Sequence, residues 1–225
     1  MIPVDKPVDW TSFDVVAKLR NGLRKACGVK KIKVGHSGTL DPFATGLLLI
    51  CTGKATKSLT ELTGRDKVYT GKMRFDGNTP SYDHTSEVIQ TFRTDHLDLS
   101  QIKKASDKFI GSIDQQVPVF SAVKKDGKRL YKYARAGESV ELPVRNVQVY
   151  SFEILDWNGV EASFTVHCGK GTYIRSLAYD LGTSLNCGGY LTELRRTAIG
   201  DHTIDDAWSL LELSGKISEL PETGL

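Results

Sequence analysis

"RNVQVYSFEILDWNGVEASFTVHC", residues 145–168, is the stretch that decides the fold class. Two segments rich in β-branched and aromatic residues flank the pair Asn158-Gly159. Asn-Gly is the pair that tight two-residue β-hairpins favour, because both of its residues tolerate a positive φ. The stretch therefore predicts two antiparallel strands joined by a short turn.

The chain that follows this hairpin mixes helix and strand signals. Residues 169–182 change from a glycine turn to an apolar period of 3.6, with Thr172 as the expected N-cap and Gly182 as the expected end of the helix. Residues 190–200 predict a strand, and residues 203–213 predict a final helix.

The chain before the hairpin shows the same mixture without a regular strand–helix alternation. Such a mixture with hairpins favours an α+β fold, in which helices flank a largely antiparallel mixed sheet. We expect a turn at Asp126-Gly127. The other predicted elements are helices over 11–28, 54–64 and 100–113 (with Ser100 as the cap of the last), strands over 47–53 and 66–75, and a loop over 77–87.

Composition excludes several classes of protein. Of 225 residues, 40% are hydrophobic and 25% are charged, which is ordinary for a soluble globular protein. The longest apolar run, residues 47–51, is far shorter than the ~20 residues that a membrane-spanning helix needs. The N-terminus has no signal-peptide core, so we expect a cytosolic protein. The four cysteines form no C-x-x-C pair and H-E-x-x-H is absent, so we expect no metal.

Basic residues gather in two segments, although the net charge is only +3. Residues 22–35 contain five Lys and Arg and no acidic residue. Residues 121–135 contain six basic residues against Asp126 alone, interleaved with Tyr131 and Tyr133. Such segments favour a partner that carries phosphate groups.

"GHSGTLDP", residues 35–42, places a carboxylate in a glycine-rich loop. Gly35 and Gly38 allow a positive φ or close approach of the backbone to a ligand. Pro42 keeps Asp41 away from helical geometry. We therefore expect Asp41 to be displayed at the end of a tight turn.

Other motifs with known chemistry do not fit. The serine-hydrolase elbow G-x-S-x-G fails, because Thr39 stands where its second glycine belongs. Ala55 and Gly171 follow the lysines of two short glycine segments, so neither is a phosphate loop, and no G-x-G-x-x-G precedes a helix. A nucleotide cofactor is not expected.

Several long segments, in order, resemble the TruB family of tRNA pseudouridine-55 synthases. The opening "VDKPVDWTS" resembles the N-terminal segment of that family. The segments that carry the resemblance are "GHSGTLDPFATGLLLICTGKATK", "QVPVFSAVKKDGKRLYKYARAG", "GKGTYIRSL" and "GGYLTELRRTAIG". The resemblance spans nearly the whole chain and implies a pseudouridine-synthase-like fold.

The resemblance also implies a reaction. The enzyme would break the C1′–N1 bond of a flipped-out uridine, turn the uracil over and rejoin it through C5. No atom is added and no redox change occurs, so no cofactor is expected. Asp41 would act as the nucleophile at C1′ or would assist formation of a glycal, and both routes stay open.

The resemblance assigns roles to particular residues. Arg175 would keep Asp41 charged and oriented, and Tyr69 would stack on the uracil or handle a proton at C2′. His36 would stabilise the RNA around the flipped base. The remaining expected RNA-binding residues are Asp83, Lys124, Lys128, Arg129, Tyr131 and Arg135, and the expected structural residues of the site are Lys6, Gly35, Gly38 and Thr172.

One loop departs from the family pattern. The family shows a glycine and then T-x-T-x-D after the strand that carries the tyrosine. Here Asp76 occupies the glycine position and Gly77 follows. Asp83 still matches the RNA-contacting aspartate of the family, so we expect the loop to be retained.

The expected organisation is one catalytic domain over residues 1–225, with a basic, RNA-gripping insertion over about 118–146. A C-terminal domain of the PUA type is not expected. The expected partner is the T-stem and loop of tRNA, bound by a monomer without membrane or metal. Two alternatives are a guide-RNA-dependent pseudouridine synthase and a non-catalytic module that binds or folds tRNA.

Overall fold

The computed structural model describes residues 1–220, which fall into two compact units. Unit 1 contains Met1–Tyr69 and the chain from Leu194 onward, and unit 2 contains Thr70–Glu193. Strands β4 (Lys67–Arg74) and β12 (Tyr190–Ile199) each contain a boundary between the units. We describe each unit by itself; the expectation of one catalytic domain stays a prediction.

The strands of unit 1 form a sheet in the order β14-β1-β3-β12, with β2 paired to β3 and β13 to β12. Pairing is antiparallel between β1 and β3 and parallel in β1–β14 and β3–β12. The other strand and helix bounds are β1 Ile2–Lys6, β2 Val34–His36, β3 Thr45–Thr52, β13 His202–Thr203, β14 Trp208–Ser209, α1 Ser12–Ala26, α2 Leu59–Gly64 and α6 Leu210–Ser218.

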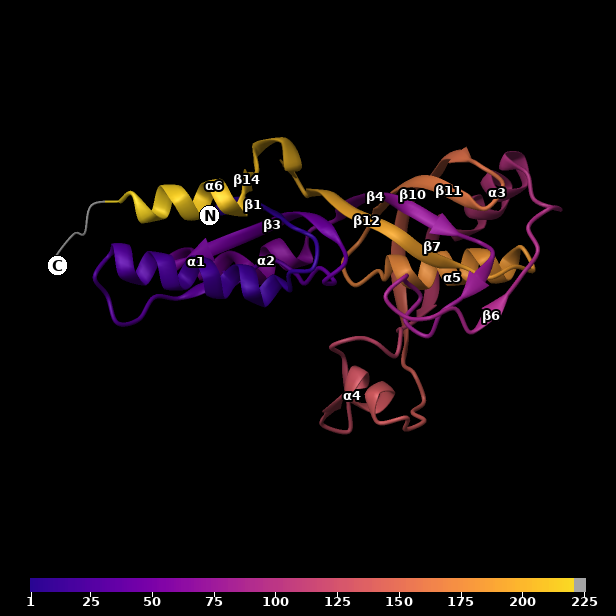
Figure 1. Cartoon of the computed structure of the whole chain (residues 1–225), viewed down its shortest axis with the longest axis horizontal. Helices are drawn as coiled ribbons and strands as arrows, with labels where there is room; N and C mark the ends of the chain where they lie inside the picture. Colours follow the sequence, from indigo (N-terminus) through magenta and orange to yellow (C-terminus); the bar gives the residue numbers. More distant parts are fainter. Residues whose placement is uncertain (221–225) are drawn as a thin grey trace. The chain divides into compact units, whose positions relative to one another are not determined.

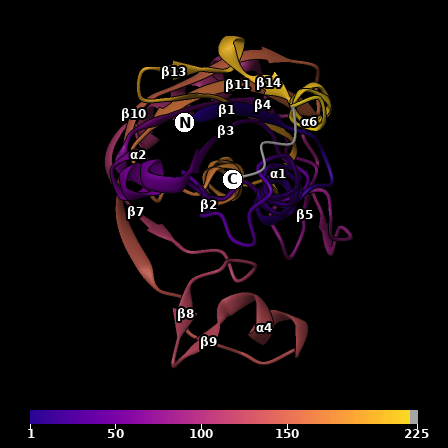
Figure 2. The same cartoon turned by 90° about the vertical axis from the view of Figure 1, so that its left-hand side faces the viewer.

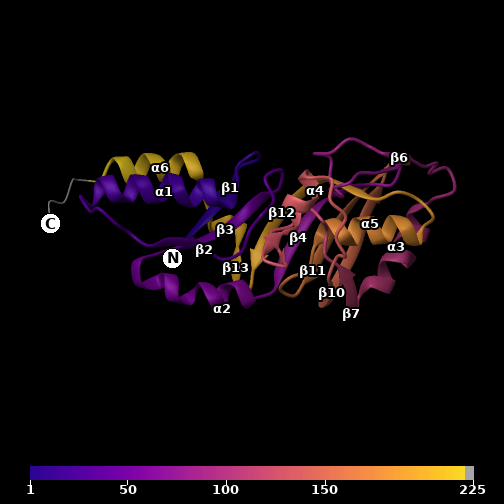
Figure 3. The same cartoon turned by 90° about the horizontal axis from the view of Figure 1, so that it is seen from below.

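Helices α1 and α6 lie side by side on unit 1 (Figures 1 and 3). The apolar face of α1 packs with that of α6 against Leu48 and Ile50 of β3. The helix begins where Thr11 and Asp14 form a capping box, close to the start of the predicted helix over 11–28. The other face of β3, with Leu47 and Leu49, packs against Leu62 of α2. This burial on both faces fixes the strand that follows the 35–42 loop.

Unit 2 is built on the predicted hairpin. Strands β10 (Val144–Trp157) and β11 (Glu161–Cys168) pair antiparallel, and β7 (Gly111–Gln116) pairs with β10. Asn158 Oδ1 accepts hydrogen bonds from the amides of Val160 and Glu161, which closes the turn. The expected largely antiparallel sheet flanked by helices is confirmed. The remaining elements of unit 2 are β5 Gly77–Asn78, β6 Gln90–Thr91, β8 Lys124–Lys125, β9 Lys128–Arg129, α3 Leu99–Ser106, α4 Leu130–Arg135 and α5 Ile174–Ser184.

The basic insertion stands apart from the sheet of its own unit (Figures 1 and 2). It consists of the two-stranded sheet β8–β9 and the short helix α4. Asp126 and Gly127 have φ values of 51° and 79°, so the predicted turn is confirmed. Leu130 is fully buried and anchors α4. The insertion is therefore a small ordered arm rather than an extended loop.

Two predicted helix caps are wrong. The N-cap of α3 is Asp98, whose side chain and that of Gln101 form a reciprocal capping box, so Ser100 lies inside the helix. At α5 the N-cap position is Tyr173, which makes no side-chain cap, and the Thr172 hydroxyl instead donates to the Gly169 carbonyl at 3.0 Å. The start of α5 is fixed by Gln115 of β7, which exchanges two hydrogen bonds with the Tyr173 backbone. These two hydrogen bonds from a residue distant in sequence take the place of a local side-chain cap.

Three predicted helices have different bounds. Residues 53–58 form a 3-10 helix before α2, and the predicted helix over 100–113 gives way to a 3-10 turn and then to β7 from Gly111. Within 203–213, a 3-10 turn and the short strand β14 precede α6, where the Ser209 hydroxyl accepts from the Glu212 amide as the cap. In the last two cases the cause is visible: β7 pairs with β10, and β14 pairs with β1 before the cap at Ser209.

Helix α5 continues past Gly182 to Ser184. The glycine is nevertheless required, because a Cβ at Gly182 would lie 2.1 Å from the carbonyl oxygen of Gly188. The sequence signal is thus one of close backbone approach and not of a helix end.

Candidate active site

The 35–42 loop of unit 1 is held by backbone and hydroxyl contacts. The Ser12 hydroxyl accepts from the Leu40 amide at 2.9 Å, and the Ala44 amide donates to the Asp41 carbonyl at 3.1 Å. A Cβ at Gly35 would lie 2.6 Å from Leu59 Cδ1, and Gly38 has a φ of 129°. Both glycines are therefore structural requirements. Asp41 is half-buried in the turn before β3 and is not sealed in the interior.

His36 lies at the end of β2 in this loop. Its Nδ1 accepts a hydrogen bond from the Gly38 amide at 3.2 Å, so the proton of the neutral ring lies on Nε2. Burial, and then the positive charge of Arg196, lower the pKa of His36. The ring is therefore a neutral group that can donate one hydrogen bond through Nε2.

Lys6, at the end of β1, is fully buried against the same loop. Its Nζ donates to the carbonyls of Pro7, Trp10 and Pro42 at 2.8, 2.6 and 3.1 Å. Burial lowers its pKa to about 8, and the negative charge of nearby Asp41 opposes that shift. Lys6 thus fixes the backbone directly after Asp41, which fits the structural role expected for it.

Tyr69 is the third residue of β4 and the last residue of unit 1. Its side chain is buried, with a relative exposure of 9%.

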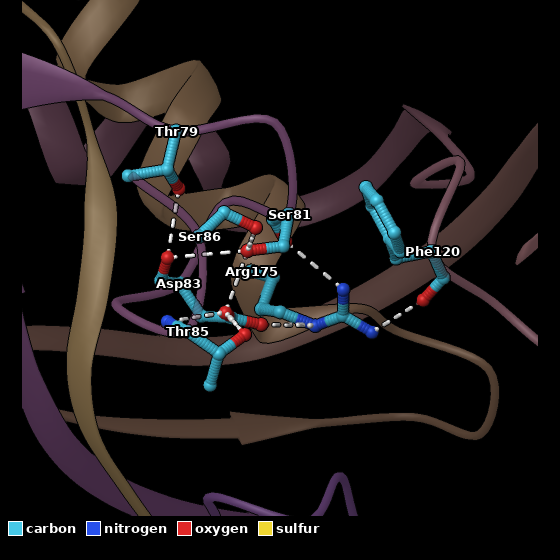
Figure 4. A network of polar contacts seen from close by, with 7 residues as sticks. All are labelled: Thr79, Ser81, Asp83, Thr85, Ser86, Phe120 and Arg175. Carbon is cyan, nitrogen blue, oxygen red and sulfur yellow. Dashed lines mark hydrogen bonds and ion pairs between the residues drawn. The ribbon is translucent and has the colours of Figure 1, made fainter. Parts of the chain in front are cut away.

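Arg175 is the centre of a polar network in unit 2 (Figure 4). The guanidinium is 3% exposed and donates to the carbonyls of Ser81 and Phe120, each at 3.0 Å. Its Nε lies 3.6 Å from an oxygen of the Asp83 carboxylate, which is itself buried. The pair is buried and hydrogen-bonded on both sides, as a buried charge requires.

The loop over 79–86 closes on itself around Asp83 (Figure 4). The Asp83 carboxylate accepts from the Ser81 hydroxyl at 2.6 Å and from the Thr85 amide at 3.0 Å. The Thr79 hydroxyl donates to the Asp83 carbonyl at 2.8 Å. Asp83 is thus engaged in organising this loop and Arg175. Its expected contact with RNA stays a prediction.

The basic insertion carries the remaining expected RNA-binding residues. Lys124, Arg129 and Arg135 are exposed, and Lys128 and Tyr131 are half-buried. The Arg135 guanidinium lies 5.6 Å from the centre of the Tyr131 ring, and the Lys128 ammonium lies 4.3 Å from that of Tyr133. These contacts hold cations and aromatic rings together on the insertion.

Apart from Tyr69, the expected site residues form three groups, one of which is the basic insertion just described. Unit 1 brings together Lys6, Gly35, His36, Gly38 and Asp41 in one loop and its support. In unit 2, Asp83 and Arg175 form the buried pair, with Thr172 just before the helix that carries Arg175. Asp41 and Arg175 belong to different units, and their pairing stays a prediction.

Sequence reasoning missed three residues that organise these groups: Arg196, Gln115 and Tyr82. Arg196 donates a hydrogen bond to the Gly38 carbonyl of the 35–42 loop, and the Gln115 side chain accepts one from the Tyr173 amide at the start of α5. Tyr82 has a φ of 60° and stacks on Tyr179 with ring centres 4.2 Å apart, and burial raises its pKa to about 12. Only Arg196 had a signal, since it lies in one of the segments that carry the resemblance.

Residues 1–220 contain neither a cluster of metal-ligating side chains nor a helix able to cross a membrane. They contain no group of three or more His, Cys, Asp or Glu side chains that could hold a metal ion. In this same part of the chain, every helix is too short or too polar to cross a membrane.

Solved structures define the class of fold. A Cbf5-Nop10-Gar1 complex matches with a TM-score of 0.70 and 29% identity, over 95% of this chain and 53% of that chain. An H/ACA RNP bound to a substrate RNA containing 2′-deoxyuridine matches with a TM-score of 0.69 and 28% identity, over 95% of this chain and 52% of that chain. The chain thus spans about half the length of these structures. It shares the fold of the matched chain in each of these two structures.

Sequence comparison defines the family. The family model of the TruB pseudouridylate synthase N-terminal domain matches residues 24–174, and that of the tRNA pseudouridylate synthase B C-terminal domain matches residues 175–222. A tRNA pseudouridine synthase B of Flavobacterium johnsoniae is 53% identical, over 91% of this chain and 90% of that protein. The protein of the same name from Chloroherpeton thalassium is 46% identical, over 97% and 90%. The chain belongs to the TruB family of pseudouridylate synthases.

Proposed function

We propose that this protein converts the uridine at position 55, in the T loop of tRNA, to pseudouridine. The observation that carries the proposal is the 53% identity to a tRNA pseudouridine synthase B over nine-tenths of both chains. The structure supports it with a half-buried carboxylate, Asp41, in a glycine-containing loop whose Pro42 carbonyl accepts a hydrogen bond from Lys6. Location in the cytosol and a monomeric state stay predictions.

In the proposed mechanism the carboxylate of Asp41 works at the C1′ carbon of the uridine. The C1′–N1 bond breaks and uracil leaves with the bonding electron pair, after which the base turns over. A new bond forms from C5 to C1′, C5 loses its proton and N1 gains one, so that no atom is gained or lost overall. Two routes fit this scheme: Asp41 attacks C1′, or it assists formation of a glycal.

Three side chains would support that carboxylate and the base. Arg175, which Asp83 and two carbonyls hold rigid, would orient Asp41 and keep it charged. Tyr69 would form a wall against which the extruded uracil stacks. His36, neutral and with Nε2 as its donor, would hydrogen-bond RNA next to the flipped base.

The basic insertion would bind the phosphates of the T arm. Lys124, Arg129 and Arg135 are exposed there and their positive charge is available to phosphate oxygens. Because such binding displaces counterions, its strength would fall steeply with salt.

A second candidate, guide-RNA-dependent modification, is favoured by one observation. The H/ACA particle bound to substrate RNA shares the fold of this chain with 28% identity. The higher identity to tRNA pseudouridine synthases B favours the stand-alone reaction.

One assay separates these functions and the non-catalytic alternative. Purified protein is mixed with unmodified T-arm RNA, without a guide, and pseudouridine is measured by mass spectrometry after nuclease digestion. We expect product with the wild type and a loss of at least about 10⁴-fold with Asp41→Asn, because removal of a reacting group typically costs that much. Asp201→Asn is the matched control, since Asp201 lies in the same unit and its side chain is exposed at the surface. Product only with a guide, or tight binding without product, would contradict the proposal.

A further inference from the structure

Arg196, on strand β12 of unit 1, is the largest fully buried side chain among those that the structure describes, with a relative exposure of 1%. Its Nε donates to the Leu47 carbonyl at 2.8 Å, and a terminal nitrogen donates to the Gly38 carbonyl at 3.1 Å. One guanidinium therefore ties the core strand β3 to the middle of the 35–42 loop. Gly38 lies three residues before Asp41.

Glycines at two positions let the backbone of β3 and of the 35–42 loop approach Arg196 closely. Arg196 pairs with Gly46 of β3, and a Cβ at Gly46 would lie 2.3 Å from the Arg196 carbonyl oxygen. Gly46 has a φ of 108°, and Gly38 has a φ of 129°. Two glycines at positive φ thus lie against Arg196, Gly46 beside its backbone and Gly38 beside its guanidinium. Such an arrangement specifies one position for the loop.

The electrostatic setting of Arg196 is unusual for a buried cation. Both of its hydrogen bonds go to carbonyl oxygens and not to a carboxylate. Its charge lowers the pKa of His36 and that of Lys6, in each case after the larger effect of burial. Asp41 is the carboxylate with the largest opposing effect on Lys6. The 35–42 loop therefore lies in the positive field of a fixed, buried guanidinium.

The neighbouring Arg195 shows what a structural arginine looks like on the same strand. Its side chain is 40% exposed and forms two hydrogen bonds with the Asp5 carboxylate, at 3.0 and 2.7 Å. Successive side chains of a strand point to opposite faces, so Arg195 points away from the loop that Arg196 supports. The two residues share strand, charge and size, and differ in what they touch.

We propose that Arg196 is a positioning residue of the reaction: it sets the place of the Gly38 carbonyl, and with it the turn that carries Asp41, and supplies a fixed positive charge beneath that turn. The inference rests on the proposed function, in which Asp41 is the reacting carboxylate. Arg196 itself acts through the loop and is not required to touch the RNA.

The experiment compares Arg196→Met, Arg196→Lys and Arg195→Met in the full chain, on unmodified T-arm RNA under steady-state and single-turnover conditions. For folded Arg196→Met we expect kcat to fall about 100-fold with KM within about threefold, since a small displacement of a reacting group costs that much. Arg196→Lys restores the charge and one donor, so about a tenth or more of the wild-type kcat should return. The kcat of Arg195→Met should stay within about twofold of the wild type, since the Arg195 hydrogen bonds go to Asp5 and Thr45, outside the 35–42 loop.

A second readout does not depend on activity. The titration of His36 is followed by NMR in histidine-labelled protein, with His36→Gln to assign the resonance. The pKa of His36 should rise in Arg196→Met and stay near the wild-type value in Arg196→Lys and Arg195→Met. A role in packing alone would change the melting temperature without this pattern.

Each outcome of these experiments either supports or overturns the proposal. A folded Arg196→Met with wild-type kcat, a loss confined to KM, or an unchanged His36 titration would overturn the proposal. If Arg196→Met does not fold, the kcat and the His36 titration of Arg196→Lys test the proposal instead. An Arg196→Lys variant that is as inactive as Asp41→Asn, but has a wild-type His36 titration, would contradict the proposal. If the wild type forms no pseudouridine, the proposed function fails, while the titration still tests the electrostatic part of this inference.

Discussion

Two loops, 35–42 in unit 1 and 79–86 in unit 2, each accept a hydrogen bond from a buried arginine. The two arginines differ in the groups that surround their charge. Arg175 faces the carboxylate of Asp83 and two carbonyls. Arg196 donates to two carbonyls, and glycines make room for it. The comparison teaches that one loop is stabilised by an ion pair and its hydrogen bonds, and the other by backbone shape around a cation that donates to two carbonyl oxygens.

The largest expected effect tests the ion pair of Arg175 and Asp83. Arg175→Met leaves the Asp83 carboxylate buried without its guanidinium, and removal of one partner of a buried ion pair costs about 3–5 kcal/mol. We expect the free energy of unfolding, measured by urea denaturation, to fall by that amount. The double variant Arg175→Met with Asp83→Asn should recover part of the loss. Equal stability of Arg175→Met and the wild type would show that the buried pair does not hold the loop.

A smaller effect tests the loop that depends on backbone shape. Gly38→Ala places a Cβ at a φ of 129°, a region that L residues rarely adopt, and should cost about 2 kcal/mol. The measurement is again urea denaturation, with Gly64→Ala as the control, because a Cβ at Gly64 meets open space. An unchanged or raised stability of Gly38→Ala would mean that the loop adapts and that its glycine is not a conformational requirement.

The smallest expected effect contrasts one serine from each loop. The Ser37 hydroxyl is buried without a hydrogen-bond partner among the residues that the structure describes, whereas the Ser81 hydroxyl donates to Asp83 at 2.6 Å. Ser37→Ala should therefore raise the free energy of unfolding by up to about 1 kcal/mol, and Ser81→Ala should lower it by about 1 kcal/mol. Differential scanning calorimetry of both variants checks the signs. If both changes destabilise equally, the difference between the loops is not one of hydrogen bonding.

The sequence predicted those parts of the fold that depend on local patterns. Gly159, Asp126 and Gly127 adopt the positive φ that their residue types suit, so both turns could be predicted from local sequence. Asn158 contributes differently from the expectation, because it closes its turn through its side chain and not through a positive φ. The start of α5 could not be predicted in the same way, because Gln115 fixes it from 58 residues away. Likewise, the spacing of residues 203–213 does not reveal that Trp208 pairs with β1.

The candidate site was predicted mainly from resemblance, and its supporting residues were not. Nothing in the local pattern around Arg196 distinguishes it from Arg195, since both are basic residues of one strand. Burial and the identity of the hydrogen-bond acceptors separate them, and both depend on β3 and the 35–42 loop. Similarly, Tyr82 adopts a positive φ because the network around Asp83 and its stack on Tyr179 determine the backbone there.

Within the basic insertion, two lysines already have acidic partners: Lys125 with Glu141 at 2.9 Å and Lys128 with Glu138 at 2.7 Å. An arriving polyanion would compete with these glutamates for the same ammonium groups. If the insertion binds RNA as proposed, phosphates would replace the glutamates at these ammonium groups. The internal ion pairs of the insertion and its binding of RNA would then depend on the same lysines and would both weaken as ionic strength rises.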